Sequence, residues 1–348
     1  MVGRFKKMAS VAAGVAFAAV TAGCGAGNTG GDTGSNTDDS GRPIKVMTHP
    51  YQAMRLPAVV GDAQGHFEDE GISVEFVDQP GGLSAFQALK STGSQLTQID
   101  DAGLVASWQA GAKLKVACGQ QTRMLLSVVA PAGNTLDSVE EGADWRDVLQ
   151  QLEDKVVGSP VPEGSGFYKF IEALFEEASV DTDSVTFVNV GAATPQVAAA
   201  LEHGQVDAAI TLPTGTQHLQ ESGTAVELMY LPETDSIFST LHAAVWVGEP
   251  DWIDSNSETV KAFCAGIQTA SEFTHEESNV DTLVPIMMED MKLTASVAKR
   301  VLEDGVYDTY TTELTRAEWG QTVKGLIKAG TIESSPIPAY DELFASPG

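Results

Sequence analysis

Short apolar runs alternate with amphipathic helical patterns along the chain after residue 43. A first group of expected strands covers residues 44–47, 72–77, 95–99 and 114–117. The expected helices between them cover residues 58–63, a segment that starts at Ser84, and residues 102–109. Strands that alternate with helices are typical of parallel α/β units, so this part of the chain predicts a first α/β lobe.

The same alternation resumes after residue 150 and predicts a second α/β lobe. Its expected strands cover residues 155–157, 185–188 and 206–210, and its expected helices cover residues 167–178 and 196–202. Breaker clusters at residues 131–134 and 231–235 are the candidate hinges. We therefore expect two doubly wound lobes, with lobe 1 formed by residues 44–130 and 238–348 and lobe 2 by residues 131–237.

After a returning strand at residues 243–247 the pattern is almost entirely helical. In residues 257–273 the apolar positions Val260, Phe263, Ile267 and Ala270 recur at steps of three and four, as in an amphipathic helix. Such a tail packs on an existing sheet. In open α/β sheets ligands bind at the carboxyl ends of the strands, so a ligand crevice is expected between the two lobes.

The N-terminus has the features of a secretory signal peptide, expected over residues 1–23. Arg4, Lys6 and Lys7 precede a small and apolar run over residues 8–20. This run is shorter than the ~20 residues that a spanning helix needs. The small residues before Cys24 resemble a bacterial lipobox, which implies that Cys24 becomes the lipidated N-terminus; ordinary secretion with cleavage nearby is the alternative.

Residues 24–43 consist of the candidate lipid-bearing cysteine and a segment of Gly, Asn, Thr, Ser and Asp with almost nothing apolar. Such a composition cannot repay the entropy of ordering, so we expect a flexible tether. A lipid, a tether and a folded body together predict an extracytoplasmic protein that is anchored to the cell membrane through its lipid alone.

Charge and composition limit the partners that this protein can have. The 348 residues include 20 Lys and Arg against 48 Asp and Glu, and the formal net charge is −28. This balance disfavours nucleic acid and acidic membrane surfaces as partners. A hydrophobic content of 43% and a mean hydropathy of −0.04 are those of a folded protein, so the acidity describes a solvated surface or a saline habitat.

Motifs for catalysis and for metal binding are not evident in the sequence. The six histidines show no metal-ligand spacing, and Gly164-Ser165-Gly166 does not match the GxSxG pattern of hydrolases. We therefore expect no enzyme, no metal and no cofactor. Cys118 and Cys264 could form a disulfide in an oxidising compartment, although burial as small hydrophobic residues is the default for cysteines in such apolar surroundings.

Four stretches, in this order, carry a resemblance to a known family. They are residues 50–72 with their Gly-His-Phe-Glu-Asp-Glu-Gly-Ile corner, residues 81–89, residues 199–208 and residues 258–263. Together they resemble the ABC-transporter solute-binding proteins of the taurine, alkanesulfonate, nitrate and thiamine-precursor group (NMT1/THI5-like), which have the type II periplasmic-binding fold. Independently of the family, Gly71 can end a helix in the left-handed backbone conformation, and Ile72 starts a buried strand. Phe67 is expected to hold this corner by packing against it.

The resemblance implies that ligand contacts come from strand ends and helix starts. Tyr51 and Gln52 match a ligand loop after the first strand, although a solvated turn would look the same. Ser84 matches a helix-start hydroxyl, which a simple N-cap also requires. Ser165 matches the loop that opens the first large helix of lobe 2.

Other positions of this set are less sharply defined. Phe167 and Tyr168 could stack on a ligand or pack in the core. Thr211 and Thr214 lie near a strand end where the family often has a tryptophan and a proline, and Leu212-Pro213 keeps only the proline. The complete set of candidate ligand residues is Thr48, His49, Tyr51, Gln52, Arg55, Gly82, Ser84, Asp100, Asp101, Arg123, Glu163, Ser165, Tyr168, Thr211, Thr214 and His242.

One departure from the family changes the expected ligand. Sulfonate, taurine and nitrate binders have small Gly-Ser-Ser-like residues after the third strand, whereas this chain has Asp100-Asp101-Ala102. A carboxylate against a buried anion costs several kcal/mol unless it is protonated or paired. We expect a cationic or donor-rich group facing Asp101, or Asp100 if the register differs by one; alternatively Asp101 caps the following helix.

Three basic residues could complete the site. Arg55 and Arg123 lie near strand ends and could clamp a carboxylate, or could pair with surface acids. His242 lies on the returning strand, where some relatives have a ligand-facing Asp. An acidic and a basic group in one crevice would suit a zwitterion or a heteroaromatic ring.

The sequence thus predicts a monomeric, lipid-anchored solute-binding protein that closes over a small organic ligand and delivers it to an ABC permease and its ATPase. A surface lipoprotein that uses the same fold as a sensor or adhesin is the first alternative. The second is an enzyme, because eukaryotic pyrimidine-synthesising relatives share the fold. Those relatives carry a cysteine-rich motif that this chain lacks.

Overall fold

The first of two five-stranded sheets is built from the beginning of the folded body and one returning strand. A computed structural model describes residues 42–49, 53–79 and 85–344 of the chain. The strand order is β2-β1-β3-β10-β4. These strands are β1 (Ile44–Thr48), β2 (Val74–Asp78), β3 (Leu96–Asp100), β4 (Lys115–Gln121) and β10 (Ala244–Gly248). β1 runs parallel to β2 and β3, whereas β10 lies antiparallel between β3 and β4.

The second sheet has the same arrangement, with the strand order β7-β6-β8-β5-β9. Its strands are β5 (Ser127–Pro131), β6 (Val156–Ser159), β7 (Thr186–Asn189), β8 (Ala208–Thr211) and β9 (Ala225–Tyr230). β5 is antiparallel to both β8 and β9. Both sheets are therefore mixed, and β5 and β9 are strands that the alternating pattern did not predict.

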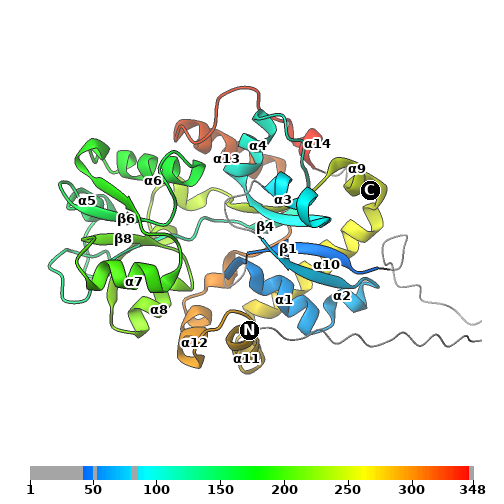
Figure 1. The fold of residues 1–348 in the computed structure, drawn as a ribbon, viewed down its shortest axis with the longest axis horizontal. Coiled ribbons are helices and arrows are strands. Elements are labelled where there is room, and N and C mark those ends of the chain that lie inside the picture. The colour runs from blue at the N-terminus through cyan, green and yellow to red at the C-terminus, as the bar shows by residue number, and fades with distance from the viewer. Residues whose placement is uncertain (1–41, 50–52, 80–84, 345–348) are drawn as a thin grey trace, which may run out of the picture. The chain divides into compact units, whose positions relative to one another are not determined.

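Helices cover both faces of each sheet (Figure 1). The helices from the parts of the chain that build the first sheet are α1 (Leu56–Ala63), α2 (His66–Asp69), α3 (Ala85–Thr92), α4 (Asp101–Gln109), α9 (Pro250–Ser255), α10 (Ser257–His275), α11 (Val280–Asp290), α12 (Ala295–Glu303), α13 (Arg316–Lys328) and α14 (Tyr340–Leu343). Those of the second are α5 (Trp145–Gln150), α6 (Gly166–Glu177), α7 (Thr194–Glu202) and α8 (Gly215–Glu221). The prediction of a two-lobed α/β fold with a helical C-terminal region is confirmed.

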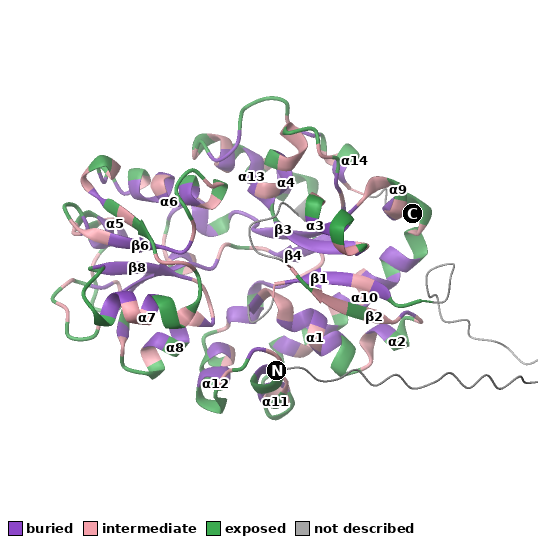
Figure 2. Ribbon diagram, viewed as in Figure 1, coloured by how far each residue is buried: buried purple, intermediate pink, exposed green. Residues whose placement is uncertain are grey.

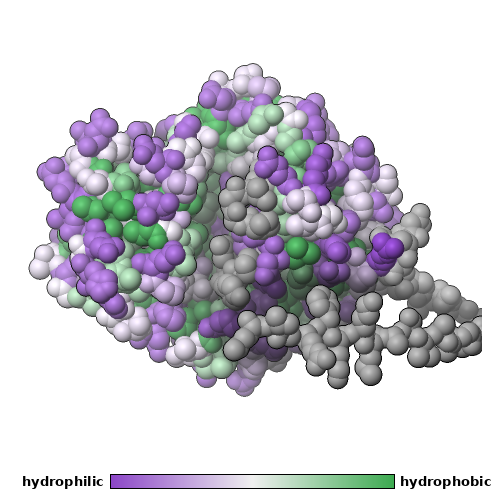
Figure 3. All heavy atoms as spheres, in the orientation of Figure 1, coloured by the Kyte–Doolittle hydropathy of each residue, from purple (hydrophilic) through white to green (hydrophobic). Residues whose placement is uncertain are grey.

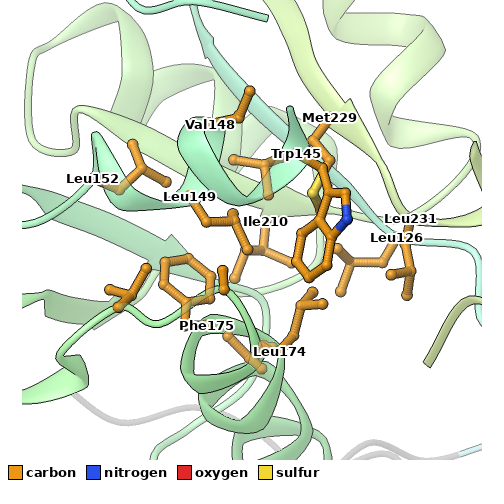
Figure 4. Close-up of a cluster of buried hydrophobic side chains, with 14 of the residues drawn as sticks. Leu126, Trp145, Val148, Leu149, Leu152, Leu174, Phe175, Ile210, Met229 and Leu231 are labelled. Carbon is orange, nitrogen blue, oxygen red and sulfur yellow. The ribbon is translucent and has the colours of Figure 1, made fainter. Parts of the chain in front are cut away.

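The strands are mostly buried, and the helices bury one side while exposing the other (Figure 2). In the second sheet, side chains of α5 and α6 pack on Ile210 of β8, with Phe175 and Trp145 among them (Figure 4). A separate apolar cluster with Val197 and Leu219 covers the other face. Hydrophilic residues occupy much of the visible surface of the described part (Figure 3), as the acidic composition requires. None of the described helices combines the length and the apolar character that crossing a membrane requires.

The predicted corner at residues 65–72 is present and tightly packed. Gly71 has a φ of 76°, and Phe67 is fully buried with its ring stacked on Phe263 of α10, at 5.6 Å between centroids. A Cβ atom at Gly61 or Gly266 would lie 2.8 or 2.6 Å from the Phe67 ring. The absence of side chains at these glycines therefore allows α1, α2 and α10 to close around one phenyl ring.

Two segments, residues 122–126 and 231–243, carry the chain between the sheets. The N–H of Leu231 donates to the carbonyl of Leu126 at 2.8 Å, and the N–H of Ala243 donates to the carbonyl of Gln121 at 2.9 Å. The paired segments thus form the connection between the lobes. Pro131 is the last residue of β5, so the breaker at residues 131–134 ends a strand of the second sheet. The chain leaves the first sheet before this breaker, at residues 122–126.

Cys118 of β4 and Cys264 of α10 form a disulfide, with their Cα atoms 6.1 Å apart. The default expectation, two free cysteines buried as small hydrophobic residues, is therefore wrong. The sequence allowed the pairing but could not decide for it, because 146 residues separate the two cysteines and only the packing of α10 on the sheet brings them together. The bridge attaches the helical C-terminal region to the first sheet.

Replacing both Cys118 and Cys264 by Ala should lower the free energy of unfolding by about 2–5 kcal/mol, because the bridge closes a long loop in the unfolded chain. Urea unfolding of the variant and the wild type measures this difference. Reductant should lower the midpoint of the wild type and leave that of the double variant unchanged. Equal sensitivity of the two proteins to reductant would contradict the bridge.

Candidate functional site

A cavity of about 260 Å³ lies between elements of the two sheets. From the first sheet and its helices it is lined by His49, Ala53, Met54, Asp100, Gln121, Ala243, Ala244 and Tyr310. From the crossover and the second sheet it is lined by Met124, Leu125, Val161, Phe167, Leu212 and Pro213. Residues that follow β1, β6 and β8 within two positions and the last residues of β3 and β4 all contribute. The cavity is therefore at the carboxyl ends of strands, as in other open α/β proteins that bind ligands.

Most of the lining is apolar, and few polar groups face the cavity. Phe167, Met54, Met124 and Leu212 supply much of the apolar wall. Asp100 is the one carboxylate among the described lining residues, and none of these is Lys or Arg. The described wall is therefore mainly apolar, with one carboxyl group among its lining residues.

Asp100 sits at the junction of β3 and α4 and caps the helix. Its Oδ1 accepts the N–H of Gly103 at 2.7 Å. The residue keeps contact with solvent, yet desolvation by the surrounding protein raises the pKa of its carboxyl, against the effect of the Gly103 hydrogen bond. The neighbouring Asp101 raises this pKa further. The N-cap role that the sequence allowed for Asp101 thus belongs to Asp100.

His49 follows β1 and is the second sequence-predicted residue that lines the cavity. Burial lowers the pKa of its imidazole below the ordinary value of 6.5. The ring is therefore neutral at pH 7, and it can offer both a donor and an acceptor nitrogen. Burial also raises the pKa of Tyr310, which keeps this lining phenol protonated.

Two buried glutamines fix the wall next to His49. The side-chain amides of Gln98 and Gln120 both donate to the carbonyl of Met54, at 2.7 and 2.8 Å. Met54 belongs to the 3₁₀ turn η1 (Ala53–Arg55), so these bonds hold that turn against β3 and β4. The sequence pattern did not single out these glutamines, because a polar residue inside an apolar strand has no visible partner until the fold is known.

Asp101 is not among the lining residues of the larger cavity and pairs with His242. Its Oδ2 lies 2.8 Å from Nδ1 of His242, and the two side chains are only 2% and 3% exposed. The backbone N–H of His242 donates to the hydroxyl of Thr322 on α13 at 3.0 Å. Two of the sequence candidates, 141 residues apart, thus form a buried pair at the point where the chain returns to the first sheet.

Arg55 is engaged in a structural network. Its guanidinium donates to Asp78 and to the hydroxyl of Thr48, both at 2.9 Å, and forms an ion pair with Asp290 at 3.0 Å. It lines a separate surface groove with these acids. Arg55 and Thr48 are therefore occupied with each other in this structure, which matches the surface-acid alternative for Arg55.

The remaining described candidates have local roles or lie at the surface. Ser165 caps α6 by accepting the N–H of Tyr168 at 3.2 Å, and Tyr168 packs edge-on against Phe187. The hydroxyl of Thr211 bonds that of Thr216 at 2.7 Å. Of the other described candidates, Thr214 is buried, whereas Arg123 and Glu163 are exposed. The candidates Tyr51, Gln52, Gly82 and Ser84, and the lipidation candidate Cys24, lie outside the described residues.

Several lining residues were not among the sequence candidates. Ala53, Met54, Met124 and Leu125 are apolar residues in short connections, and Tyr310 comes from a 3₁₀ region far along the chain. Two other lining positions did have a signal: Leu212-Pro213, as the place where the family often has a tryptophan, and Phe167, as a ring that could stack on a ligand. In the described parts of the chain no group of three His, Cys, Asp or Glu is arranged to hold a metal ion.

The two mixed sheets, the paired crossovers and the cavity between them define a two-lobed binding-protein fold. A family model described as NMT1/THI5 like matches residues 52–279. The chain belongs to this family. A sequence comparison with curated proteins found no match.

Solved structures with the same fold include three transport proteins. The periplasmic aliphatic sulphonate binding protein SsuA from Escherichia coli has a TM-score of 0.65 and 14% identity, covering 82% of this chain and 90% of its own. The ligand binding component of an ABC-type import system from Staphylococcus aureus, with zinc bound, has a TM-score of 0.65 and 13% identity, with coverages of 87% and 96%. The periplasmic nitrate-binding protein NrtA from Synechocystis PCC 6803 has a TM-score of 0.62 and 10% identity, with coverages of 84% and 83%.

Replacing Asp101 by Leu or His242 by Phe should each lower the free energy of unfolding by about 3–5 kcal/mol, because each leaves a buried polar partner alone. The double variant should lose clearly less than the sum of the two single losses, since it removes both members of the pair. Urea unfolding at pH 7 measures all three proteins. Additive losses would show that the two side chains do not interact.

His49 should make stability depend on pH. Its pKa is lower in the folded protein than in the unfolded chain, so the unfolded chain binds a proton first as the pH falls below about 6.5. His49→Gln should therefore lose less stability than the wild type between pH 7 and pH 5, measured by urea unfolding. His203→Gln, a change at an exposed position, is the control and should follow the wild type. A wild-type slope in the His49 variant would contradict the assignment.

Proposed function

We propose that the protein is the solute-binding component of an ABC importer, which captures a small organic ligand in the cavity between its lobes and delivers it to a permease and its ATPase. The single observation that carries this proposal is the 260 Å³ cavity at the strand ends, to which both sheets contribute. Membership of the NMT1/THI5-like family and the likeness to sulphonate, nitrate and ABC-import binding proteins support it.

The mechanism is binding and closure, without chemistry, by a monomer. The two crossover segments are short and hydrogen-bonded to each other, so they can serve as a hinge. A ligand that touches both walls of the cavity favours the closed form, which the permease can distinguish from the open one. Both described cysteines are joined in a disulfide, so neither is available as a thiol nucleophile.

The proposed location is extracytoplasmic, with the lipid on Cys24 as the membrane anchor. The basic and apolar leader, the small residues before Cys24 and the polar tether support this placement. The disulfide between Cys118 and Cys264 supports it independently, because such bonds persist in oxidising compartments. Mass spectrometry of the membrane fraction tests it by detecting a diacylated N-terminal Cys24.

The ligand is proposed to be cationic or heteroaromatic. The apolar walls suit a flat or aliphatic body, while Asp100 and a neutral His49 supply hydrogen-bonding groups. A zwitterion also needs a cation on the protein. Neither arginine candidate lines the cavity: Arg55 is paired with Asp78 and Asp290, and Arg123 is exposed. This favours ligands without a strong negative group.

A thermal-shift panel tests the proposed function. The panel contains amines, amino acids, thiamine and flavin precursors, aromatic acids, sulfonates and nitrate. A true ligand at 100 times its dissociation constant should add about 2.7 kcal/mol to the stability. Leu212→Trp, which fills the cavity, should abolish the shift, whereas Val226→Trp at an exposed position should preserve it.

Each result of this panel has a definite meaning. A shift that disappears only in Leu212→Trp supports solute capture in this cavity. A shift that persists in Leu212→Trp places the binding elsewhere. Silence across the whole panel would contradict solute binding and favour the alternative of a surface lipoprotein that acts as a sensor or adhesin.

A further inference from the structure

A second, much smaller cavity adjoins the larger one. Its volume of about 20 Å³ is that of a space that holds a single water-sized group. Asp100, Met124, Phe167 and Ala243 line both cavities, so they form a shared wall. The rest of its lining includes Asp101, His242 and Thr331. A ligand in the larger cavity can therefore place one small terminal group next to these three residues.

Three buried polar atoms belong to this small cavity's lining residues. Asp101 Oδ1, His242 Nε2 and Thr331 Oγ1 have no hydrogen-bond partner among the described residues. The side chains of Asp101 and His242 are 2% and 3% exposed, and Thr331 is 6% exposed. Leaving a buried polar atom unpaired is costly, so three such atoms on the lining residues of one small cavity indicate a site that is built for a partner.

The hydrogen-bonding pattern limits what that partner can be. A carboxylate can only accept, so the 2.8 Å contact between Asp101 and His242 needs a hydrogen on Nδ1. In the neutral ring, Nε2 then carries a lone pair. Asp101 Oδ1, His242 Nε2 and the Thr331 hydroxyl can all accept a hydrogen bond. Asp100 also lines this small cavity and adds a further carboxyl oxygen to it.

We propose that these three residues form the specificity subsite for an ammonium or primary amino group, carried by a ligand whose apolar body fills the larger cavity. Such a group has two or three N–H bonds, is close to a water molecule in size and is attracted by the Asp101 carboxylate. A carboxylate, sulfonate or nitrate in the same place would meet acceptors and a like charge. This inference rests on the proposed function and narrows its ligand class.

The position of the subsite also links the binding of an amino group to the closure of the two lobes. Asp101 starts α4, His242 lies on the crossover before β10 and Thr331 follows α13, all from the first sheet's side. Gly166 and Phe167, which line the same small cavity, start α6 of the second sheet's side. An amine held here therefore lies where α4 and α6 meet, and its binding favours the closed form over the open one.

Matched ligands test the subsite. Each set shares one apolar body and differs in its end group: benzylamine, benzyl alcohol and phenylacetate; phenethylamine, 2-phenylethanol and 3-phenylpropionate; tryptamine, tryptophol and indole-3-propionate. Thermal shifts and calorimetric dissociation constants are measured for each, beside sulfonates and nitrate. At least one amine should bind, and it should bind at least about tenfold more tightly than its alcohol and its carboxylate, since a hydrogen bond to a charged group is worth about 1.5–3 kcal/mol.

Two variants assign the effect to the subsite. Asp101→Asn keeps an acceptor for His242 Nδ1 and removes the charge, and should weaken amine binding about tenfold or more. Thr331→Val removes a hydroxyl without a described partner while keeping the shape. It should weaken the amine and leave the ligand-free protein as stable as the wild type or more so. Thr186→Val, at an exposed position of β7, is the matched control and should leave both properties unchanged.

The outcomes separate this inference from the proposed function. Preference for an alcohol or a carboxylate, binding of a sulfonate or nitrate alone, or amine binding that is unchanged in Asp101→Asn and Thr331→Val would overturn the subsite while solute binding stands. If no member of either panel binds, both the subsite and the proposed function are contradicted. An amine preference that is lost in both variants and kept in Thr186→Val supports both.

Discussion

The insertion of β10 between β3 and β4 is the constraint on which the rest of the structure depends. This strand is contributed by a distant part of the chain, yet it supplies hydrogen bonds on both of its edges at the middle of the first sheet. To reach that position the chain must leave the first sheet, build the second one and return. The two crossovers therefore lie together at one end of the sheets, and the ligand cavity lies beside them.

The chemistry of the candidate site follows from the register of the same strand. Ala244 of β10 is opposite Asp100 of β3, and the N–H of Asp101 donates to the carbonyl of Ala243 at 3.1 Å. His242, the residue before Ala243, therefore lies next to the first turn of α4. The same hydrogen-bond ladder that completes the sheet thus brings a carboxylate and an imidazole together, with Asp100 left to cap the helix and to border the larger cavity.

Sequence reasoning predicted the features that are local or periodic. The leader remains a prediction, whereas the alternating strands and helices, the corner around Phe67 and the helical C-terminal region agree with the structure. β5 was missed because it follows β4 with no helix between them, so the alternation that reveals parallel units is absent there. β9 was missed together with α8, the short helix that precedes it. The Asp101–His242 pair, the disulfide and the buried glutamines depend on contacts over long sequence separations, and no local pattern in a single sequence encodes them. The choice between Asp100 and Asp101 as the cap was ambiguous because adjacent aspartates offer the same side chain at either register.

The late position of β10 in the chain also restricts the order in which the two sheets can fold. Until Gly248 has been made, β3 and β4 each present an open edge in the middle of the unfinished first sheet. All strands of the second sheet precede β10, so that sheet can assemble first, before the strand that joins β3 to β4 has been made. An exposed strand edge is a template for pairing with other chains. A chain that is cut short before residue 244 would accordingly be expected to aggregate, even though it contains nine of the ten named strands of the described part.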